Sequence, residues 1–122
     1  LVQLLDRVRT PFGVNLAAQV AAQAALRDEA HMQRSVARTV CERRAMAEAL
    51  AAMGLRVAPS AANFLFVDLG RPNGPVNEAL LGQGVIVKPW KEPGFTQFLR
   101  VSVGSGEDNA RFLVALRDAL AS

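Results

Sequence analysis

The sequence has no tyrosine, one histidine and one cysteine among its 122 residues. A single cysteine excludes an intramolecular disulfide, and with a single histidine it also excludes a cluster of Cys and His metal ligands. We expect Cys41 to be a small, buried or half-buried apolar residue, and His31, which has charged neighbours, to be solvated. Because side chains suited to acid–base catalysis are so few, the composition argues against an enzyme formed by this chain alone.

Features of several other protein classes are missing too. No apolar run reaches the roughly 18 residues of a membrane span, and there is no basic and apolar leader. The phosphate-binding GxxxxGK(S/T) loop is absent, and Gly104-Ser105-Gly106 lacks the third glycine of a dinucleotide fingerprint. The net charge of +3 comes from 14 basic and 11 acidic residues that alternate along predicted helices, as on a solvated surface. We therefore expect a cytoplasmic protein that binds neither a membrane nor nucleic acid.

The first half of the chain is dominated by one long helix. Residues 15–53 contain no proline or glycine and are rich in alanine, leucine and arginine, so they are predicted to be helical, with a bend at Arg27-Asp28-Glu29. A straight helix of that length would span about 58 Å, whereas a globule of this size has a radius of gyration of roughly 14 Å. The helix is thus expected to reach beyond its own domain. It follows a shorter predicted helix at Leu1–Val8 and a turn at Thr10–Gly13.

The second half alternates short strands with helices, after a predicted helix cap at Gly54. The patterns predict strands at 55–57, 63–69, 84–88 and 98–104, with Pro89 ending the third, and helices at 76–82 and 108–120. The strand at 63–69 is the most apolar and is expected at the centre of the sheet. These elements predict a two-layer α/β sandwich (α+β), in which a small four-stranded sheet is covered by helices on one face.

The strand Phe98–Gly104 carries a permanent charge in its middle. Alternation places Leu99, Val101 and Val103 on the core face and Arg100 on the other face. A half-buried guanidinium requires an anion, which is either a carboxylate of the chain, at Asp68 or Glu92, or a bound ligand. Lys88 ends the preceding strand and would come near Arg100 if the two strands pair antiparallel. Beyond the strand, Ser105 and Asp108 have capping-box spacing and predict the start of the last helix.

Four ordered motifs resemble the C-terminal portion of histidinol-phosphate aminotransferases, which are fold-type-I, class I/II enzymes that use pyridoxal 5′-phosphate. The match runs over nearly the whole chain. Its motifs are Arg9-Thr10-Pro11-Phe12-Gly13-Val14-Asn15 before the Ala-rich helix, Pro59-Ser60-Ala61-Ala62-Asn63-Phe64, Gly84-Val85-Ile86-Val87, and Leu99-Arg100-Val101-Ser102-Val103-Gly104 before Glu107-Asp108-Asn109.

The resemblance implies three segments in the chain, and it implies which functional residues lie in this chain and which lie upstream. Residues 1–14 would be the tail of an upstream large-domain region, 15–53 the connecting helix and 54–122 the small C-terminal domain. Arg100 would bind the anionic substrate of a homodimeric enzyme that transfers amino groups between histidinol phosphate and 2-oxoglutarate in histidine biosynthesis. The Schiff-base lysine and the other cofactor-binding residues would lie upstream. Lys88 and Lys91 are the wrong lysines by position, so this chain alone is expected neither to bind the cofactor tightly nor to transaminate.

One departure from the family leaves the substrate open. Many relatives have arginine where this chain has Lys88, at a position associated with the phosphate of histidinol phosphate. Lysine keeps the charge but loses the bidentate fork. An aromatic-amino-acid aminotransferase and a threonine-phosphate decarboxylase are therefore alternatives. A different class of alternative is a non-catalytic ligand-binding or interaction module derived from an aminotransferase.

Overall fold

The computed structural model describes residues 4, 7–8 and 13–121. Most of the predicted segment 1–14 lies outside these residues. The chain divides into two compact units, Leu1–Ser35 and Val36–Ser122. The predicted domain boundaries at 14/15 and 53/54 stay predictions.

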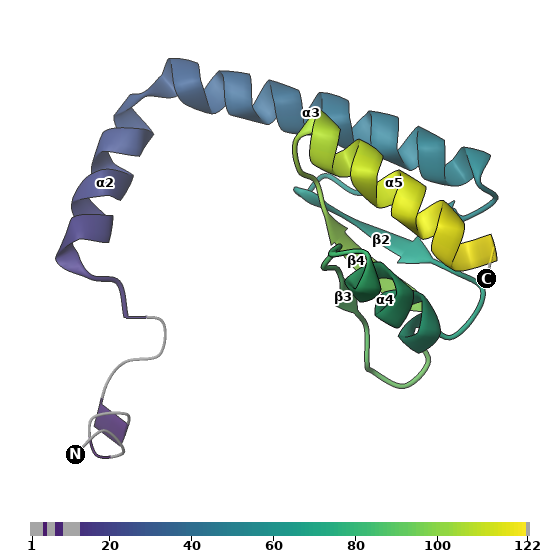
Figure 1. The fold of residues 1–122 in the computed structure, drawn as a ribbon. Helices are drawn as coiled ribbons and strands as arrows, with labels where there is room; N and C mark the ends of the chain where they lie inside the picture. The colour runs from purple at the N-terminus through teal and green to yellow at the C-terminus, as the bar shows by residue number, and fades with distance from the viewer. Residues whose placement is uncertain (1–3, 5–6, 9–12, 122) are drawn as a thin grey trace. The chain divides into compact units, whose positions relative to one another are not determined.

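The long helical region consists of two helices, α2 (Leu16–Arg27) and α3 (Glu29–Ala52) (Figure 1). Asn15 caps α2 by accepting a 2.8 Å hydrogen bond from the backbone N–H of Ala18. Asp28 has non-helical dihedrals and its carboxylate accepts the backbone N–H of His31, so the same residue ends α2 and starts α3. The predicted bend is confirmed. No residue of α2 is buried, and its large apolar side chains Leu16, Val20 and Leu26 are exposed.

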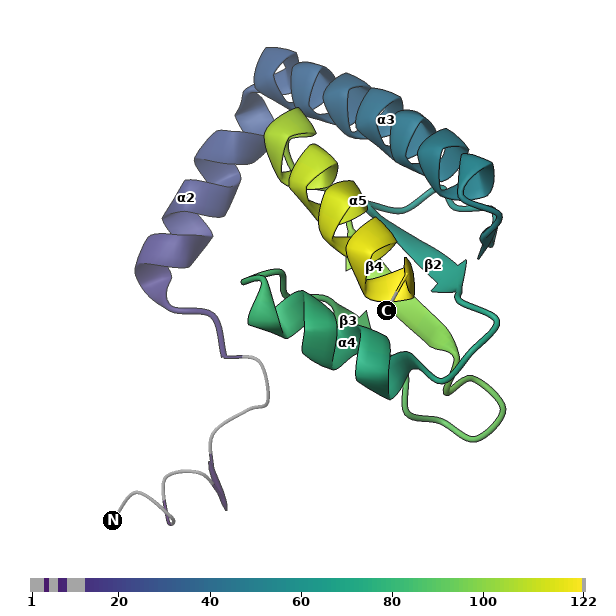
Figure 2. The ribbon, with the colours of Figure 1, turned by 45° about the vertical axis from the view of Figure 1, so that its right-hand side comes forward.

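The sheet has the strand order β1-β2-β4-β3, and every pair is antiparallel. Its strands are β1 (Arg56–Val57), β2 (Phe64–Asp68), β3 (Lys88–Pro89) and β4 (Phe98–Ser102). As predicted, β2 is a central strand. Figure 2 shows α3, α4 (Asn73–Gly82) and α5 (Gly106–Ala121) on the same side of the sheet. The predicted two-layer sandwich is confirmed.

The core lies between the sheet and these helices. Alternation turns Leu65 and Val67 of β2 inwards, together with Leu99 and Val101 of β4. Helical spacing brings side chains of the three helices onto them, chiefly Met46, Leu50, Val76, Leu80, Phe112 and Leu116. The last helix turns one face inwards at helical spacing: Phe112 and Leu116 are buried, and Leu113 and Leu120 are partly buried.

Both predicted helix boundaries in this unit are present. Gly54 has φ 81°, and its N–H donates to the carbonyl of Ala51. The N–H of Leu55 donates to the carbonyl of Leu50, so these two hydrogen bonds close the end of α3. At the start of α5, the Ser105 hydroxyl accepts the N–H of Asp108 at 3.1 Å, and the carboxylate of Asp108 bonds back to Ser105. The capping box is therefore confirmed.

A buried amide joins α5 to its neighbours. Asn109 accepts the N–H of Gly104 at 2.9 Å through its side-chain oxygen, and its amide nitrogen donates to the carboxylate of Glu42 on α3 at 2.8 Å. Its exposed fraction is 5%. One side chain thus ties the segment after β4 to both helices.

Two predicted elements differ from the structure by more than two residues at one end. The third strand was expected at 84–88 but covers only Lys88–Pro89, because Gly84 and Val85 donate their N–H groups to the end of α4. The alternating burial of 85–87 therefore reflects packing and not strand pairing. The helix expected at 76–82 begins earlier, at Asn73, since Pro75 is tolerated within a first turn.

Cys41 is exposed on α3, and the prediction that it is buried or half-buried is wrong. The helix turns its buried stripe, through Met46 and Leu50, towards the core. Five residues rotate an α-helix by about 140°, so Cys41 points well away from the direction of Met46. Periodicity alone did not say which face of this Ala-rich helix would be covered.

Candidate anion-binding face of the sheet

The sheet face opposite the three helices carries both predicted site residues. We call this the open face. Because directly paired residues of antiparallel strands project to the same side, the register assigns the members of this face. They are Arg56 of β1, Phe64, Phe66 and Asp68 of β2, Lys88 of β3, and Phe98, Arg100 and Ser102 of β4.

Lys88 and Arg100 are direct partners in the β3–β4 register. The antiparallel pairing on which their proximity depended is thereby confirmed. Like charges placed opposite each other destabilise a strand pair unless an anion lies between or beside them. Arg100 is half-buried, whereas Lys88 is exposed. The pair therefore places a planar fork and a point charge side by side on the open face.

The internal salt bridge considered for Arg100 does not form. Asp68 instead bonds to Arg56, its partner across β1 and β2, and its second oxygen accepts the N–H of Gly70 at 2.9 Å. The hydrogen bond from Arg56, followed by that from Gly70, holds the pKa of Asp68 below its usual range. Within the described part of the chain, Arg100 has no ion pair with Asp68 or Glu92.

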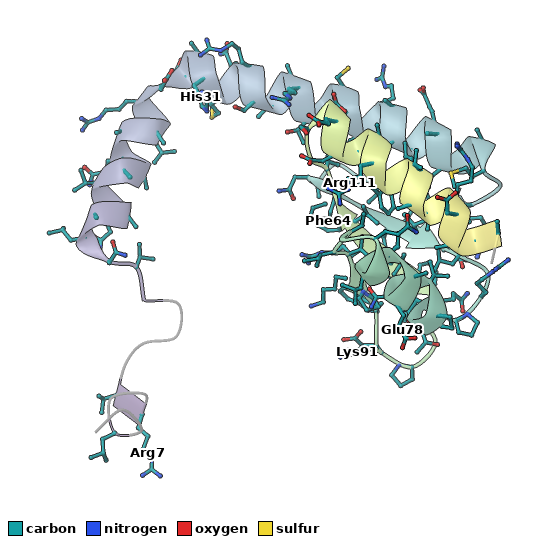
Figure 3. All side chains as sticks on the ribbon, in the orientation of Figure 1. Arg7, His31, Phe64, Glu78, Lys91 and Arg111 are labelled. Atoms are coloured by element: carbon teal, nitrogen blue, oxygen red, sulfur yellow. The ribbon has the colours of Figure 1, made fainter. Side chains whose placement is uncertain are left out.

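Both cations lie over aromatic rings. The guanidinium carbon of Arg100 is 5.0 Å from the ring centroid of Phe64, and the ammonium nitrogen of Lys88 is 5.7 Å from that of Trp90. Phe64 is labelled on the sheet in Figure 3. The sequence prediction assigned no site role to either ring. The i, i+2 spacing of Lys88 and Trp90 could have suggested their contact, but the contact of Arg100 with Phe64 depends on strand register.

A second group of rings borders the cations. We call it the aromatic cluster: Phe66, Trp90, Phe95 and Phe98. Phe66 stacks on Phe98 at 4.6 Å between centroids, and Trp90 meets Phe66 edge-on at 5.3 Å. Asn73, at the start of α4, donates its amide N–H groups to the carbonyls of Trp90 and Phe98. These bonds tie the loop that carries Trp90 to the sheet.

The two lysines of the chain are both exposed. Lys88 is exposed on the open face over Trp90, and Lys91 is exposed on the loop after β3 (Figure 3). Neither ammonium is enclosed with a group that could hold a phosphate and a pyridinium ring. His31, the single histidine, is exposed on α3, and the described residues contain no group of three or more His, Cys, Asp or Glu that could hold a metal. Among the described helices, none is long and apolar enough to cross a bilayer.

The family model of the class I and II aminotransferases matches residues 1–116. The chain belongs to this family. Histidinol-phosphate aminotransferase 3 of Rhizobium meliloti (strain 1021) is 50% identical over 118 residues, which make up 97% of this chain and 32% of that protein. Histidinol-phosphate aminotransferase 1 of Mesorhizobium japonicum is also 50% identical, over 96% of this chain and 32% of its own length. The chain thus spans about a third of the curated relatives it matches.

Solved structures agree on the aminotransferase fold. The crystal structure of histidinol-phosphate aminotransferase from Sinorhizobium meliloti in complex with pyridoxal-5′-phosphate superposes with a TM-score of 0.82 at 24% identity, over 98% of this chain and 33% of that one. The enzyme of the same name from Clostridium acetobutylicum gives a TM-score of 0.78 at 24% identity, over 94% and 36%. The resemblance predicted from the four motifs is confirmed. The roles of Arg100 and Lys88 in substrate binding stay predictions.

Proposed function

We propose that the chain is the C-terminal part of a pyridoxal-phosphate-dependent aminotransferase that acts on histidinol phosphate and 2-oxoglutarate in histidine biosynthesis. Its share of the work is to bind the anionic groups of the substrates with Arg100 and Lys88. The observation that carries this proposal is the direct pairing of these two cations on the open face, with no carboxylate of the described chain bound to Arg100. The names of the most similar relatives support the choice of reaction.

The two cations suit different anions. The planar fork of Arg100 can bind a carboxylate through two parallel hydrogen bonds, and its half-buried position strengthens that contact by limiting competition from water. Lys88 is a compact charge on a flexible stem, so it suits a phosphate that approaches from solvent. Arg100 would accordingly hold the substrate carboxylate and Lys88 the phosphate.

The cofactor belongs to the rest of the protein in this proposal. Pyridoxal phosphate acts as an electron sink when it is bound through a lysine, and the exposure of both lysines of this chain supports placing that lysine elsewhere in the protein. The whole enzyme would be a cytoplasmic homodimer, and this chain would be inactive alone. An absorption band of a lysine–pyridoxal-phosphate adduct on the isolated chain would contradict that division.

The test is steady-state kinetics of the full-length protein that contains this chain. Arg100→Ala should lower kcat/KM for 2-oxoglutarate at least about tenfold, which corresponds to about 1.4 kcal/mol of transition-state binding. Arg117→Ala, an exposed arginine of α5 on the helical side of the sheet, is the matched control and should leave kcat/KM unchanged. An effect of Arg100→Ala no larger than that of the control would refute the assignment.

The substrate is tested separately with Lys88→Ala. The loss in kcat/KM should be greater for histidinol phosphate than for histidinol, which lacks the phosphate. Equal losses would remove Lys88 from phosphate binding. A wild-type protein that prefers phenylalanine, or that decarboxylates threonine phosphate, would replace the proposed substrate. A full-length protein that neither binds pyridoxal phosphate nor transaminates would instead be a non-catalytic module.

A further inference from the structure

The contacts of Phe64 set it apart from the other rings on the sheet. Its side chain lies on the open face, so it is not part of the core between sheet and helices. Ring-to-ring contacts join the four members of the aromatic cluster to one another, and within the described residues none involves Phe64. Its aromatic contact is with the guanidinium of Arg100. The packing of the fold therefore does not explain why this position holds an aromatic ring.

A ring holds a cation differently from a carboxylate. The face of an aromatic ring attracts a cation within about 6 Å of its centroid, and both cation–ring distances on the open face meet that limit. A carboxylate would occupy some of the five N–H donors of a guanidinium, whereas a ring face leaves them in the plane of the fork. A carboxylate would also repel an incoming anion. Aromatic support thus orients the cation while keeping its charge and its donors for a ligand.

We propose that Phe64 and Trp90 are positioning residues of the anion site. Phe64 holds the guanidinium of Arg100, and Trp90 holds the ammonium of Lys88, in place of carboxylates that would neutralise them. This inference rests on the proposed role of the two cations. It adds that the site's affinity depends on two rings that act through their cations.

The main test uses Phe64→Leu and Phe64→Tyr in the full-length enzyme. Leucine keeps an apolar side chain but removes the ring, so Arg100 loses its support and the KM for 2-oxoglutarate should rise about two- to fivefold, with kcat changed less than about twofold. Tyrosine keeps the ring and should restore the wild-type KM. Phe95→Leu is the matched control, because Phe95 contacts Phe66 and Phe98 and carries no cation among the described residues. Its KM should equal that of the wild type.

A double-variant cycle separates positioning from general packing. If Phe64 acts through Arg100, Phe64→Leu should change KM no further in a protein that already carries Arg100→Ala. Additive effects of the two changes would overturn the proposal. The proposal would also be overturned if Phe64→Leu had the wild-type KM for 2-oxoglutarate, or if Phe64→Tyr raised this KM as much as Phe64→Leu does. Should Phe64→Leu be insoluble, Phe64→Met provides the same comparison.

The second ring is tested with histidinol phosphate. Trp90→Leu should raise its KM, and Trp90→Phe, which keeps a ring, should restore most of the loss. Equal KM values for the two variants would overturn the assignment of Trp90. Failure of this inference is distinguishable from failure of the proposed function. If Arg100→Ala and Lys88→Ala weaken binding but the ring substitutions do not, the cations bind the anions without aromatic support.

Discussion

The hydrogen bonds of Asn109 predict that the order of stability of two variants at this position changes with pH. Asn109→Ala removes the hydrogen bond from the N–H of Gly104, the bond from the amide to the carboxylate of Glu42, and a longer one, at 3.3 Å, from the amide to the carbonyl of Gly104. A neutral bond contributes about 1 kcal/mol to stability and a bond to a charged group about 2 kcal/mol. The alanine variant should therefore lose about 3–4 kcal/mol of unfolding free energy at pH 7.

Asn109→Asp has nearly the same shape but a different charge. The introduced carboxylate keeps the bond to Gly104 but loses the donor that reaches Glu42 at 2.8 Å. Two carboxylates about 4 Å apart repel each other by about 4 kcal/mol at an effective dielectric constant near 20. At pH 7 the aspartate variant should thus be less stable than the alanine variant. In acid the repulsion is relieved, because a protonated carboxyl group can donate a hydrogen bond to the carboxylate beside it, so the order of the two variants should reverse.

The assay is urea unfolding followed by far-ultraviolet circular dichroism at pH 7 and pH 4.5, with the wild type measured at each pH. Adding Glu42→Gln to Asn109→Asp is the control, because it removes the repulsion and should abolish the reversal. If the alanine and aspartate variants keep the same order at both pH values, then Asn109 and Glu42 are not coupled as their geometry indicates.

Two further predictions concern the core and acid stability. Leu116→Ala, at a position with 0% exposure, should lower the unfolding free energy by about 2–5 kcal/mol. Val114→Ala on the same helix, at 55% exposure, should change it by less than about 0.5 kcal/mol. Similar losses for the two variants in urea melts would contradict the burial of Leu116 and the exposure of Val114 on α5. Asp68→Asn should cost about 1 kcal/mol at pH 7, because Arg56 is 84% exposed and solvent screens the pair. Since folding lowers the pKa of Asp68, its contribution is present above the unfolded-state pKa of about 3.9 and is lost as the pH falls through the folded-state value. The wild-type and Asp68→Asn melts should accordingly approach each other as the pH falls below about 4, and a gap that widens there would contradict this.

Local rules explain why most elements were predictable from the sequence. The break at Asp28, the cap at Gly54 and the capping box at Ser105 each depend on a few neighbouring residues, and all three are present. The central place of β2 followed from its apolar composition. The start of α4 was missed because Asn73, Gly74 and Pro75 are typical of loops, although a proline is also compatible with a first helical turn.

The site was only half predictable, because its geometry depends on contacts distant in sequence. The charge of Arg100 within an apolar strand indicated an anion site, and the pairing with Lys88 required only the assumption of antiparallel strands. The ring of Phe64 reaches Arg100 through the β2–β4 register, which no local pattern specifies. The role of the buried Asn109 amide could not be predicted from the sequence either, since asparagine in a first helical turn more often serves as a solvated cap.

Asn73 has a consequence for how this surface can change. Its side chain binds the carbonyls at both ends of the segment from Trp90 to Phe98, and its backbone N–H binds Thr96 within that segment. The segment is thereby closed at its base, independently of what its exposed middle, Lys91 to Gly94, contains. Substitutions or insertions there can reshape the rim of the open face while the strands keep their register. Asn73 thus makes this rim a place where natural variation or protein engineering can change the surface beside the proposed anion site at little cost to folding.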